Sequence, residues 1–193
     1  IDLQITMAYF SKCNYNDVFS MVRMWDIIIY NYLKEKNVQL PMVIRQEKSE
    51  AYAGAYVKDP QVGLHKWVVS FDLNSLYPHL IMQYNISPET IVGMSETHPG
   101  VDNMLSKSYD TSSIKDTNQT ITPNGALFSR DKHGFLPELM HKMYSDRSAT
   151  KKQMLQASQQ YESTGDVKYK NMIPKLHNKQ MALKIALNSA YGA

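Results

Sequence analysis

The chain ends in two long helical patterns that are separated by a single turn. Gly134 and Pro137 introduce the first pattern, which predicts a helix over residues 136–162. A turn around Gly165 follows, and the next pattern predicts a helix over 167–191. Two long helices joined by so short a link form a helical hairpin. This part of the chain is therefore restricted to antiparallel helix packing.

Another helical pattern opens the chain. Its apolar side chains recur at steps of three and four residues, as in Met21, Met24, Trp25, Ile28, Ile29, Tyr32 and Leu33. This spacing predicts a long amphipathic helix within residues 1–36, with a face that packs into a core. Residues 37–66 then become irregular and contain several proline and glycine breakers.

The middle of the chain favours short strands and loops. Residues 67–71, Trp-Val-Val-Ser-Phe, are apolar and β-rich, and they predict a buried strand that ends at Asp72. A helix should start close behind, because Pro78 fits only in a first turn. Residues 94–133 are polar and loop-rich, with one hairpin signal at 123–125, Pro-Asn-Gly. Together with the helices, these patterns indicate an α+β fold.

Composition limits the classes of protein without choosing among them. The 193 residues carry 21 Lys and Arg against 18 Asp and Glu, a net charge of +3 that is too small to imply a nucleic-acid partner. A single cysteine, Cys13, excludes an internal disulfide and fits a reducing compartment. No apolar run is long enough to span a membrane, and no signal peptide is evident. Because residue 1 is Ile and both ends read as helix, we expect a piece of a longer protein.

The first group of residues with chemical potential is Asp72-Leu-Asn-Ser-Leu-Tyr-Pro78. A carboxylate at the end of a strand is held rigidly, and Mg²⁺ prefers such hard oxygen ligands. Backbone N–H groups of Ser75, Leu76 and Tyr77, at a helix start, suit an anion. Taken alone, an aspartate at this place is more often a helix cap or turn residue.

Basic and polar residues lie on both helices of the predicted hairpin. Arg147 and Lys151, four residues apart, share a face of the first helix. Lys184, Asn188 and Tyr191 share a face of the second. These are side chains that suit phosphate, hydrogen-bonding and base-stacking contacts with a nucleotide. Each set is also compatible with an ordinary solvated helix face.

Taken together, these groups resemble DNA polymerases of family B. The Asp72 segment looks like the family's motif A, and the segment from Lys184 to Gly192 looks like motif B. Residues 52–55, Tyr-Ala-Gly-Ala, resemble its small-residue motif, and Arg147 and Lys151 resemble the triphosphate-binding basic residues of its fingers helix. Several other stretches look especially like the polymerases of T-even-type tailed phages. Asn74 and Ala190 depart from the commonest pattern, and neither has a role assigned here.

The resemblance implies an α+β architecture in three parts. Residues 1–50 would be a helical segment that follows the exonuclease region and linker. Residues 51–133 would be a partial palm, a β-sheet with helices that holds motif A. Residues 134–193 would be the helical-hairpin fingers with motif B.

The resemblance also implies a nucleotidyl-transfer reaction that uses two Mg²⁺ ions, with Asp72 and Lys184 as catalytic residues and the Leu73 carbonyl as a second metal ligand. The groups implied to hold the triphosphate are the N–H groups of Ser75, Leu76 and Tyr77 and the side chains of Arg147, Lys151, Lys184 and Asn188. Tyr77 would lie under the sugar and exclude a 2′-hydroxyl, while Tyr191 would check the new base pair. The residues implied to contact DNA are Tyr52, Gly54, Tyr191 and Gly192.

Further consequences concern partners and completeness. The implied partners are primer-template DNA, deoxynucleoside triphosphates and, through a C-terminal part beyond this chain, a sliding clamp, in the cytoplasm of an infected host cell. The family's Asp-Thr-Asp motif, which supplies the second metal-binding carboxylate, is missing, and no Asp-x-Asp occurs in the sequence. We therefore expect the chain alone to be inactive. A non-catalytic nucleic-acid- or nucleotide-binding module of polymerase shape is the alternative, and a helical-bundle protein with chance motif matches is a third possibility.

Overall fold

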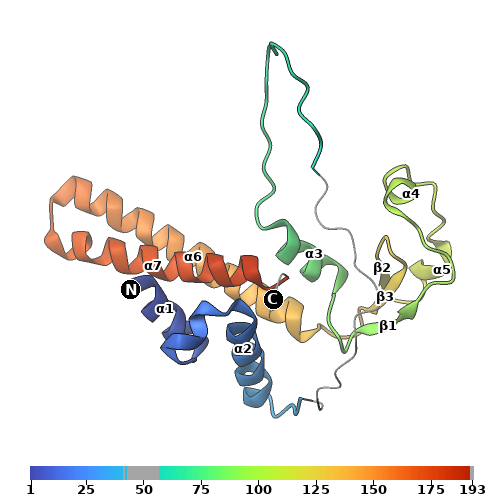
Figure 1. Cartoon of the computed structure of the whole chain (residues 1–193), viewed down its shortest axis with the longest axis horizontal. Coiled ribbons are helices and arrows are strands. Elements are labelled where there is room, and N and C mark those ends of the chain that lie inside the picture. The colour runs from blue at the N-terminus through green and yellow to red at the C-terminus, as the bar shows by residue number, and fades with distance from the viewer. Residues whose placement is uncertain (41, 43–56, 192–193) are drawn as a thin grey trace.

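The structure of the chain, a computed structural model, describes residues 1–40, 42 and 57–191. It combines helices with a small antiparallel sheet, which confirms the α+β prediction. The paired helices α6 and α7 extend to one side, with α1 and α2 packed beneath their base (Figure 1). Helix α3 lies at the centre, and the sheet lies on the opposite side with two short helices, α4 (Val101–Leu105) and α5 (Ser112–Lys115).

The helical hairpin is confirmed. Helix α6 spans Phe135–Thr164 and helix α7 spans Val167–Ser189. Gly165 ends α6 in the left-handed conformation, with φ of 66°, which a residue without Cβ adopts at little cost. The Asp166 side chain then accepts a hydrogen bond from the Lys168 N–H at 2.8 Å and caps α7.

The amphipathic helix predicted from the apolar spacing between Met21 and Leu33 is confirmed, but the helical pattern of residues 1–36 is not one continuous helix. The structure has helix α1 (Asp2–Ser11), a 3₁₀ turn η1 (Tyr15–Phe19) and helix α2 (Met21–Glu35). The break follows from Lys12, which is left-handed with φ of 55° and ends α1. Ser20 starts the next helix by accepting a hydrogen bond from the Arg23 N–H.

One hydrophobic core joins these N-terminal helices to the base of the hairpin. Its buried members are Met7, Val18, Met24, Trp25, Ile28, Leu139, Met140, Met143, Ala182, Leu183, Ala186 and Leu187. The Trp25 indole N–H donates to the Ala186 carbonyl and to the Ser189 hydroxyl, each at 3.1 Å. Burial of this apolar surface fixes the base of α6 and α7 against α1 and α2.

The sheet has three antiparallel strands in the order β1-β3-β2, namely Ile91–Met94, Ala126–Ser129 and Gln119–Ile121. Strands β2 and β3 form the predicted hairpin, with Ile121 opposite Leu127. Gly125 turns the chain with φ of 86°. Strand β1, which was not predicted, pairs with β3 across an irregularity near Gly93.

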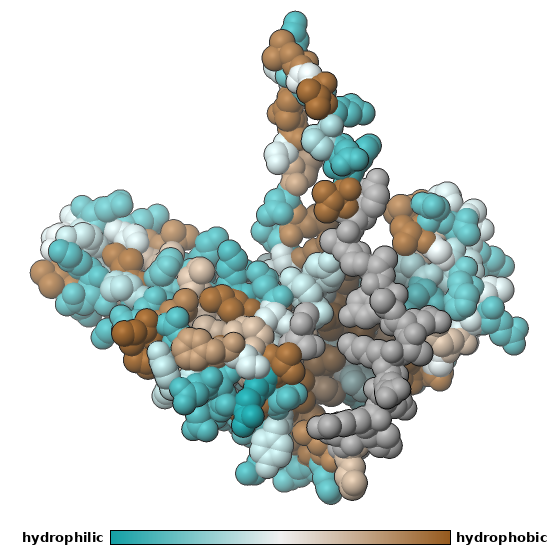
Figure 2. Space-filling view, viewed as in Figure 1, coloured by the Kyte–Doolittle hydropathy of each residue, from teal (hydrophilic) through white to brown (hydrophobic). Residues whose placement is uncertain are grey.

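The prediction of a buried strand over 67–71 is wrong for this chain. These residues belong to a long protruding segment, and its hydrophobic side chains are visible in Figure 2. Trp67 and Phe71 are 97% and 90% exposed. A strand needs hydrogen-bonding neighbours, and within the described residues no strand pairs with this segment. Helix α3, Leu76–Tyr84, begins as predicted, with Pro78 in its first turn.

Within the described part of the chain, none of the helices combines the length and apolar character that crossing a lipid bilayer requires.

Candidate functional site

A cleft of about 620 Å³ lies where the protruding segment meets α3, α6 and α7. Its lining residues are Phe71, Asp72, Leu73, Asn74, Ser75, Leu76, Tyr77, Pro78, Arg147, Lys184, Asn188 and Tyr191. Three groups of residues that are distant in the sequence therefore face one space. The structure brings the Asp72 segment together with most of the residues predicted on the two hairpin helices, namely Arg147, Lys184, Asn188 and Tyr191.

One wall of the cleft is the start of α3. Ser75 precedes the helix in the left-handed conformation. Its carbonyl accepts a hydrogen bond from the His79 N–H at 3.2 Å and lies 2.9 Å from His79 Nδ1. The N–H groups of Leu76 and Tyr77 lie in the first turn, where a helix offers them no carbonyl partner. They are consequently available to a negatively charged group in the cleft.

Arg147 enters the cleft from α6. Its Nε is buried, yet it has no hydrogen-bond partner among the described residues. A buried guanidinium N–H without a partner is costly, and an anionic ligand in the cleft would relieve that cost. Lys151, one turn further along α6, is exposed and is not among the described residues that line the cleft.

Helix α7 contributes the opposite wall. Lys184 and Asn188 are exposed and four residues apart, so they project from one face toward the same cleft. The neighbouring positions Leu183 and Leu187 are only 1% exposed and pack into the core. Because Leu183 and Leu187 must stay buried, α7 is held in the rotation about its own axis in which Lys184 and Asn188 face the cleft.

Two tyrosine rings lie against each other in the cleft. The ring centroids of Tyr77 and Tyr191 are 4.1 Å apart, and the ring planes differ by 17°. This is a stacked arrangement, and both side chains remain about half exposed, at 47% and 46%. The open surfaces of the rings provide a flat apolar platform suited to a sugar or a base.

Two groups in the cleft could act as ligands for a hard cation. Asp72 contributes one carboxylate, and the Leu73 carbonyl lies beside it in the chain. Among the residues that the structure describes, no group of three or more His, Cys, Asp or Glu side chains forms a metal site. The residues present therefore suit Mg²⁺ only if the ligand's phosphate oxygens and a further carboxylate complete its shell.

Three predicted DNA-contacting residues, Tyr52, Gly54 and Gly192, lie outside the described residues. Sequence reasoning also missed a group at the start of α6, where segment 85–90 supplies hydrogen-bond partners to the helix. A signal for it exists, because Gly134 at the start of α6 has no side chain with which to cap the helix.

A family profile and individual relatives both match this chain and indicate the same protein family. The sequence profile described as DNA polymerase family B matches residues 21–193. The chain is 35% identical to the DNA-directed DNA polymerase of Escherichia phage RB69 over 191 residues, and 34% identical to that of Enterobacteria phage T4 over 154 residues. These matches cover 99% and 80% of the chain.

A solved structure has a similar fold. It is the family B DNA polymerase of the archaeon Pyrobaculum calidifontis, with a TM-score of 0.65 over 99% of this chain and 24% sequence identity. The chain spans only 20% and 17% of the two phage proteins and 22% of the archaeal one. It corresponds to about a fifth of these relatives.

Proposed function

The chain belongs to DNA polymerase family B, and we propose that it forms the nucleotide-binding part of a longer DNA-directed DNA polymerase. That enzyme would transfer a nucleotide from a deoxynucleoside triphosphate to a primer 3′-hydroxyl, as the template directs. The observation that carries the proposal is the cleft in which Asp72 meets Arg147, Lys184 and the open N–H groups at the start of α3. A carboxylate beside several cationic or N–H donors suits a triphosphate that arrives with Mg²⁺.

Charge neutralisation and positioning are the main tasks in phosphoryl transfer. The Leu76 and Tyr77 N–H groups would donate to phosphate oxygens from one wall. Arg147 would donate from α6, which would give its buried Nε a partner, and Lys184 would do so from α7. These groups face one another across a preformed cleft, so the triphosphate would be held with its reacting phosphorus in a fixed position.

Asp72 and the Leu73 carbonyl are the groups of this chain that would hold Mg²⁺. The bound ion would neutralise phosphate charge and lower the pKa of the primer hydroxyl. A second carboxylate must come from outside the chain, because no Asp-x-Asp occurs in the sequence. We therefore propose that the 193-residue chain alone does not polymerise.

The tyrosine platform would select the sugar. Tyr77 follows the N–H groups of the first turn, so a bound triphosphate would place the sugar next to its ring. The Tyr191 ring is stacked against the Tyr77 ring and would also contact the new base pair. Asn188 would hydrogen-bond to the nucleotide, and Lys151 would join the phosphate contacts only if α6 moves.

The longer enzyme would bind primer-template DNA, and a sliding clamp would contact a part that lies beyond this chain. Because two of its relatives are phage proteins, we place the enzyme in the cytoplasm of an infected host cell.

Primer extension by the longer enzyme tests the proposal. Extension should require a divalent cation and should be abolished by Asp72→Asn. Asp102→Asn changes an exposed aspartate on α4, which does not line the cleft, and should leave extension intact. An enzyme that binds primer-template DNA tightly but never extends it would instead support the non-catalytic module. Extension by the Asp72→Asn variant at the wild-type rate would refute the role of Asp72.

A further inference from the structure

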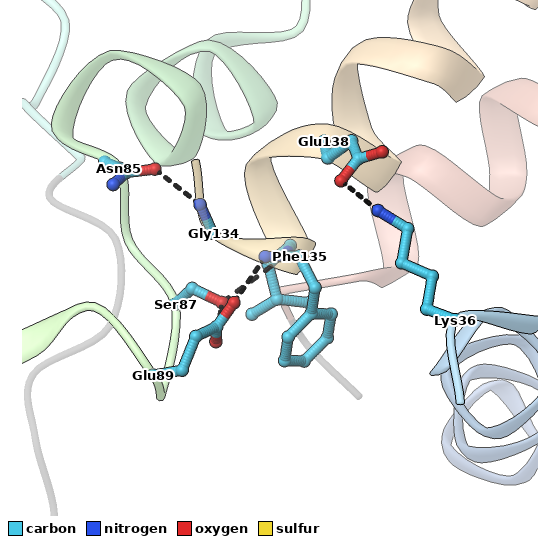
Figure 3. Close-up of polar contacts among 8 residues, drawn as sticks. Lys36, Asn85, Ser87, Glu89, Gly134, Phe135 and Glu138 are labelled. Carbon is cyan, nitrogen blue, oxygen red and sulfur yellow. Dashed lines mark hydrogen bonds and ion pairs between the residues drawn. The ribbon is translucent and has the colours of Figure 1, made fainter. Parts of the chain in front are cut away.

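The start of α6 receives its hydrogen bonds from another part of the chain. Its first residue follows Gly134, which has no side chain to serve as a cap. The Gly134 N–H donates to Asn85 Oδ1 at 2.9 Å, and the Phe135 N–H donates to Glu89 Oε1 at 2.5 Å (Figure 3). The Leu136 N–H donates to Ser87 Oγ at 3.4 Å. The next residue is proline, so segment 85–90 satisfies every free N–H group of this helix start.

Segment 85–90 is itself held in one conformation. The Ser87 hydroxyl donates to Glu89 Oε2 at 2.5 Å, so both oxygens of that carboxylate are used. Thr90 is 2% exposed, and its hydroxyl lies within hydrogen-bond distance of the Asn85 and Ser87 carbonyls, at 2.6 and 2.9 Å. The Asn85 amide also donates to the Ser129 and Lys132 carbonyls. The cap is therefore preorganised rather than assembled from mobile side chains.

The contact is also sterically tight. A Cβ atom at Gly134 would lie only 2.5 Å from the Ser87 Cβ and 3.2 Å from the Thr90 Cγ2. The backbone φ of Gly134 is −71°, which any residue adopts, so space and not conformation requires glycine here. A negative carboxylate at the N-terminus of a 30-residue helix adds an attraction to the helix dipole.

A second tie reaches the same turn of α6 from the N-terminal helices. Lys36, just after α2, forms an ion pair with Glu138 at 2.5 Å (Figure 3). Both side chains are partly exposed, so this pair supports the start of α6 less than the more buried contacts of Asn85 and Ser87 do. The contact between Glu89 and the Phe135 N–H is also exposed, and its strength comes from the charge and from both carboxylate oxygens being used.

The capped turn connects the two walls of the cleft. Segment 85–90 directly follows α3, whose first turn carries Tyr77. The same segment accepts hydrogen bonds from the start of α6, the helix that carries Arg147. At 1.5 Å of rise per residue, Arg147 lies roughly 18 Å along α6 from Phe135. A tilt of about 5° at the capped end would move Arg147 by roughly 1.6 Å, which is enough to lengthen its contact with a bound phosphate beyond hydrogen-bond distance.

We propose that Glu89 is a positioning residue for nucleotide capture, because its carboxylate anchors the start of α6 and thereby fixes Arg147 relative to the start of α3. The inference rests on the proposed polymerase function. It assigns a kinetic role to a carboxylate that does not line the cleft. Loss of the anchor should weaken nucleotide binding more than it slows the chemical step, because Asp72 and the first turn of α3 are left intact.

The test is single-turnover nucleotide incorporation by the longer enzyme, with active sites titrated. Glu89→Ala should raise the apparent Kd for the nucleotide by roughly five- to tenfold, with a smaller change in the maximal rate. Glu89→Gln keeps one acceptor but loses the charge, so its apparent Kd should fall between those of the wild type and Glu89→Ala. The control, Glu96→Ala, removes an exposed carboxylate that does not line the cleft and should match the wild type.

The outcomes separate this inference from the proposed function. A wild-type enzyme that incorporates no nucleotide would remove the proposed function itself. An active wild type with an unchanged apparent Kd in Glu89→Ala, or in Glu89→Gln if the alanine variant does not fold, would overturn the positioning role alone. A variant with fewer active sites but a normal apparent Kd shows only structural damage and also overturns it. An equal rise of the apparent Kd in Glu96→Ala would mean that loss of any negative charge has this effect, and it would also contradict the positioning role of Glu89.

Discussion

Replacing Gly134 with alanine would place a methyl group inside the contact between α6 and segment 85–90. The new Cβ would lie 2.5 Å from the Ser87 Cβ, whereas ordinary contacts are 3.4–4 Å, so the start of α6 must retreat by about 1 Å. Overpacking of this kind costs about 1–3 kcal/mol. Alanine adopts the local φ without strain and lowers the conformational entropy of the unfolded chain, which offsets about 0.4–1 kcal/mol of this cost. We expect a net local loss of about 1–2 kcal/mol.

Hydrogen exchange of the longer enzyme measures this loss where it occurs. The N–H groups of Gly134, Phe135 and Leu136 are held by segment 85–90, so their exchange should become roughly five- to thirtyfold faster in Gly134→Ala. Gly93→Ala is the matched control, because its new methyl group would have no atom of a neighbouring side chain or strand within 4 Å, and its exchange should stay close to wild type. Wild-type exchange at the start of α6 in Gly134→Ala would refute the packing argument.

Three further predictions concern other contacts. Tyr77→Ala should keep much of the deoxynucleotide incorporation but admit ribonucleotides far more readily, and an unchanged ratio of kcat/KM for matched deoxy- and ribonucleotides would show that Tyr77 is not the sugar filter. Trp25→Phe keeps an apolar ring but loses the N–H group that donates to α7, so amide hydrogen exchange near Ala186 should show a loss of local stability of about 1 kcal/mol. Unchanged hydrogen exchange in this part of α7 would contradict the prediction. The Lys36 ammonium lowers the pKa of Glu138, so the stability from this carboxylate is present above its ordinary pKa and is lost as pH falls through the lowered value. Glu138→Gln should therefore flatten the fall of melting temperature as pH drops below the ordinary glutamate pKa of about 4.3, and an equally steep fall would argue against the pair.

Local patterns predicted the helices and turns well. The steps of three and four residues, with Gly165 between them, predicted both hairpin helices, and Pro-Asn-Gly at 123–125 predicted the turn between β2 and β3. The N-terminal break at Lys12 was missed, because a lysine in the left-handed conformation has no sequence signal comparable to glycine. The strand expected at 67–71 failed because a strand depends on neighbours, and the described chain supplies none there.

The sequence indicated the separate groups of candidate residues, and the structure shows that they line one cleft. Spacing placed Lys184 and Asn188 on one helix face, but only the packing of α7 into the core shows that this face lines the cleft with Asp72. Gly134 indicates that α6 needs a cap from elsewhere, but the residues that supply the cap could not be predicted from local sequence. The contact between Glu89 and Phe135 joins residues 46 positions apart, so it depends on the tertiary fold.

The most direct test of the account is the affinity of the longer enzyme for an incoming nucleotide when Lys184 is removed. Single-turnover incorporation by Lys184→Ala should show an apparent Kd raised by roughly tenfold or more, because a charge-assisted contact with the triphosphate is lost. Lys179→Ala removes another exposed lysine of α7, one that does not line the cleft, and should bind nucleotide as the wild type does. An apparent Kd for Lys184→Ala equal to that of Lys179→Ala would contradict the claim that this cleft holds the triphosphate.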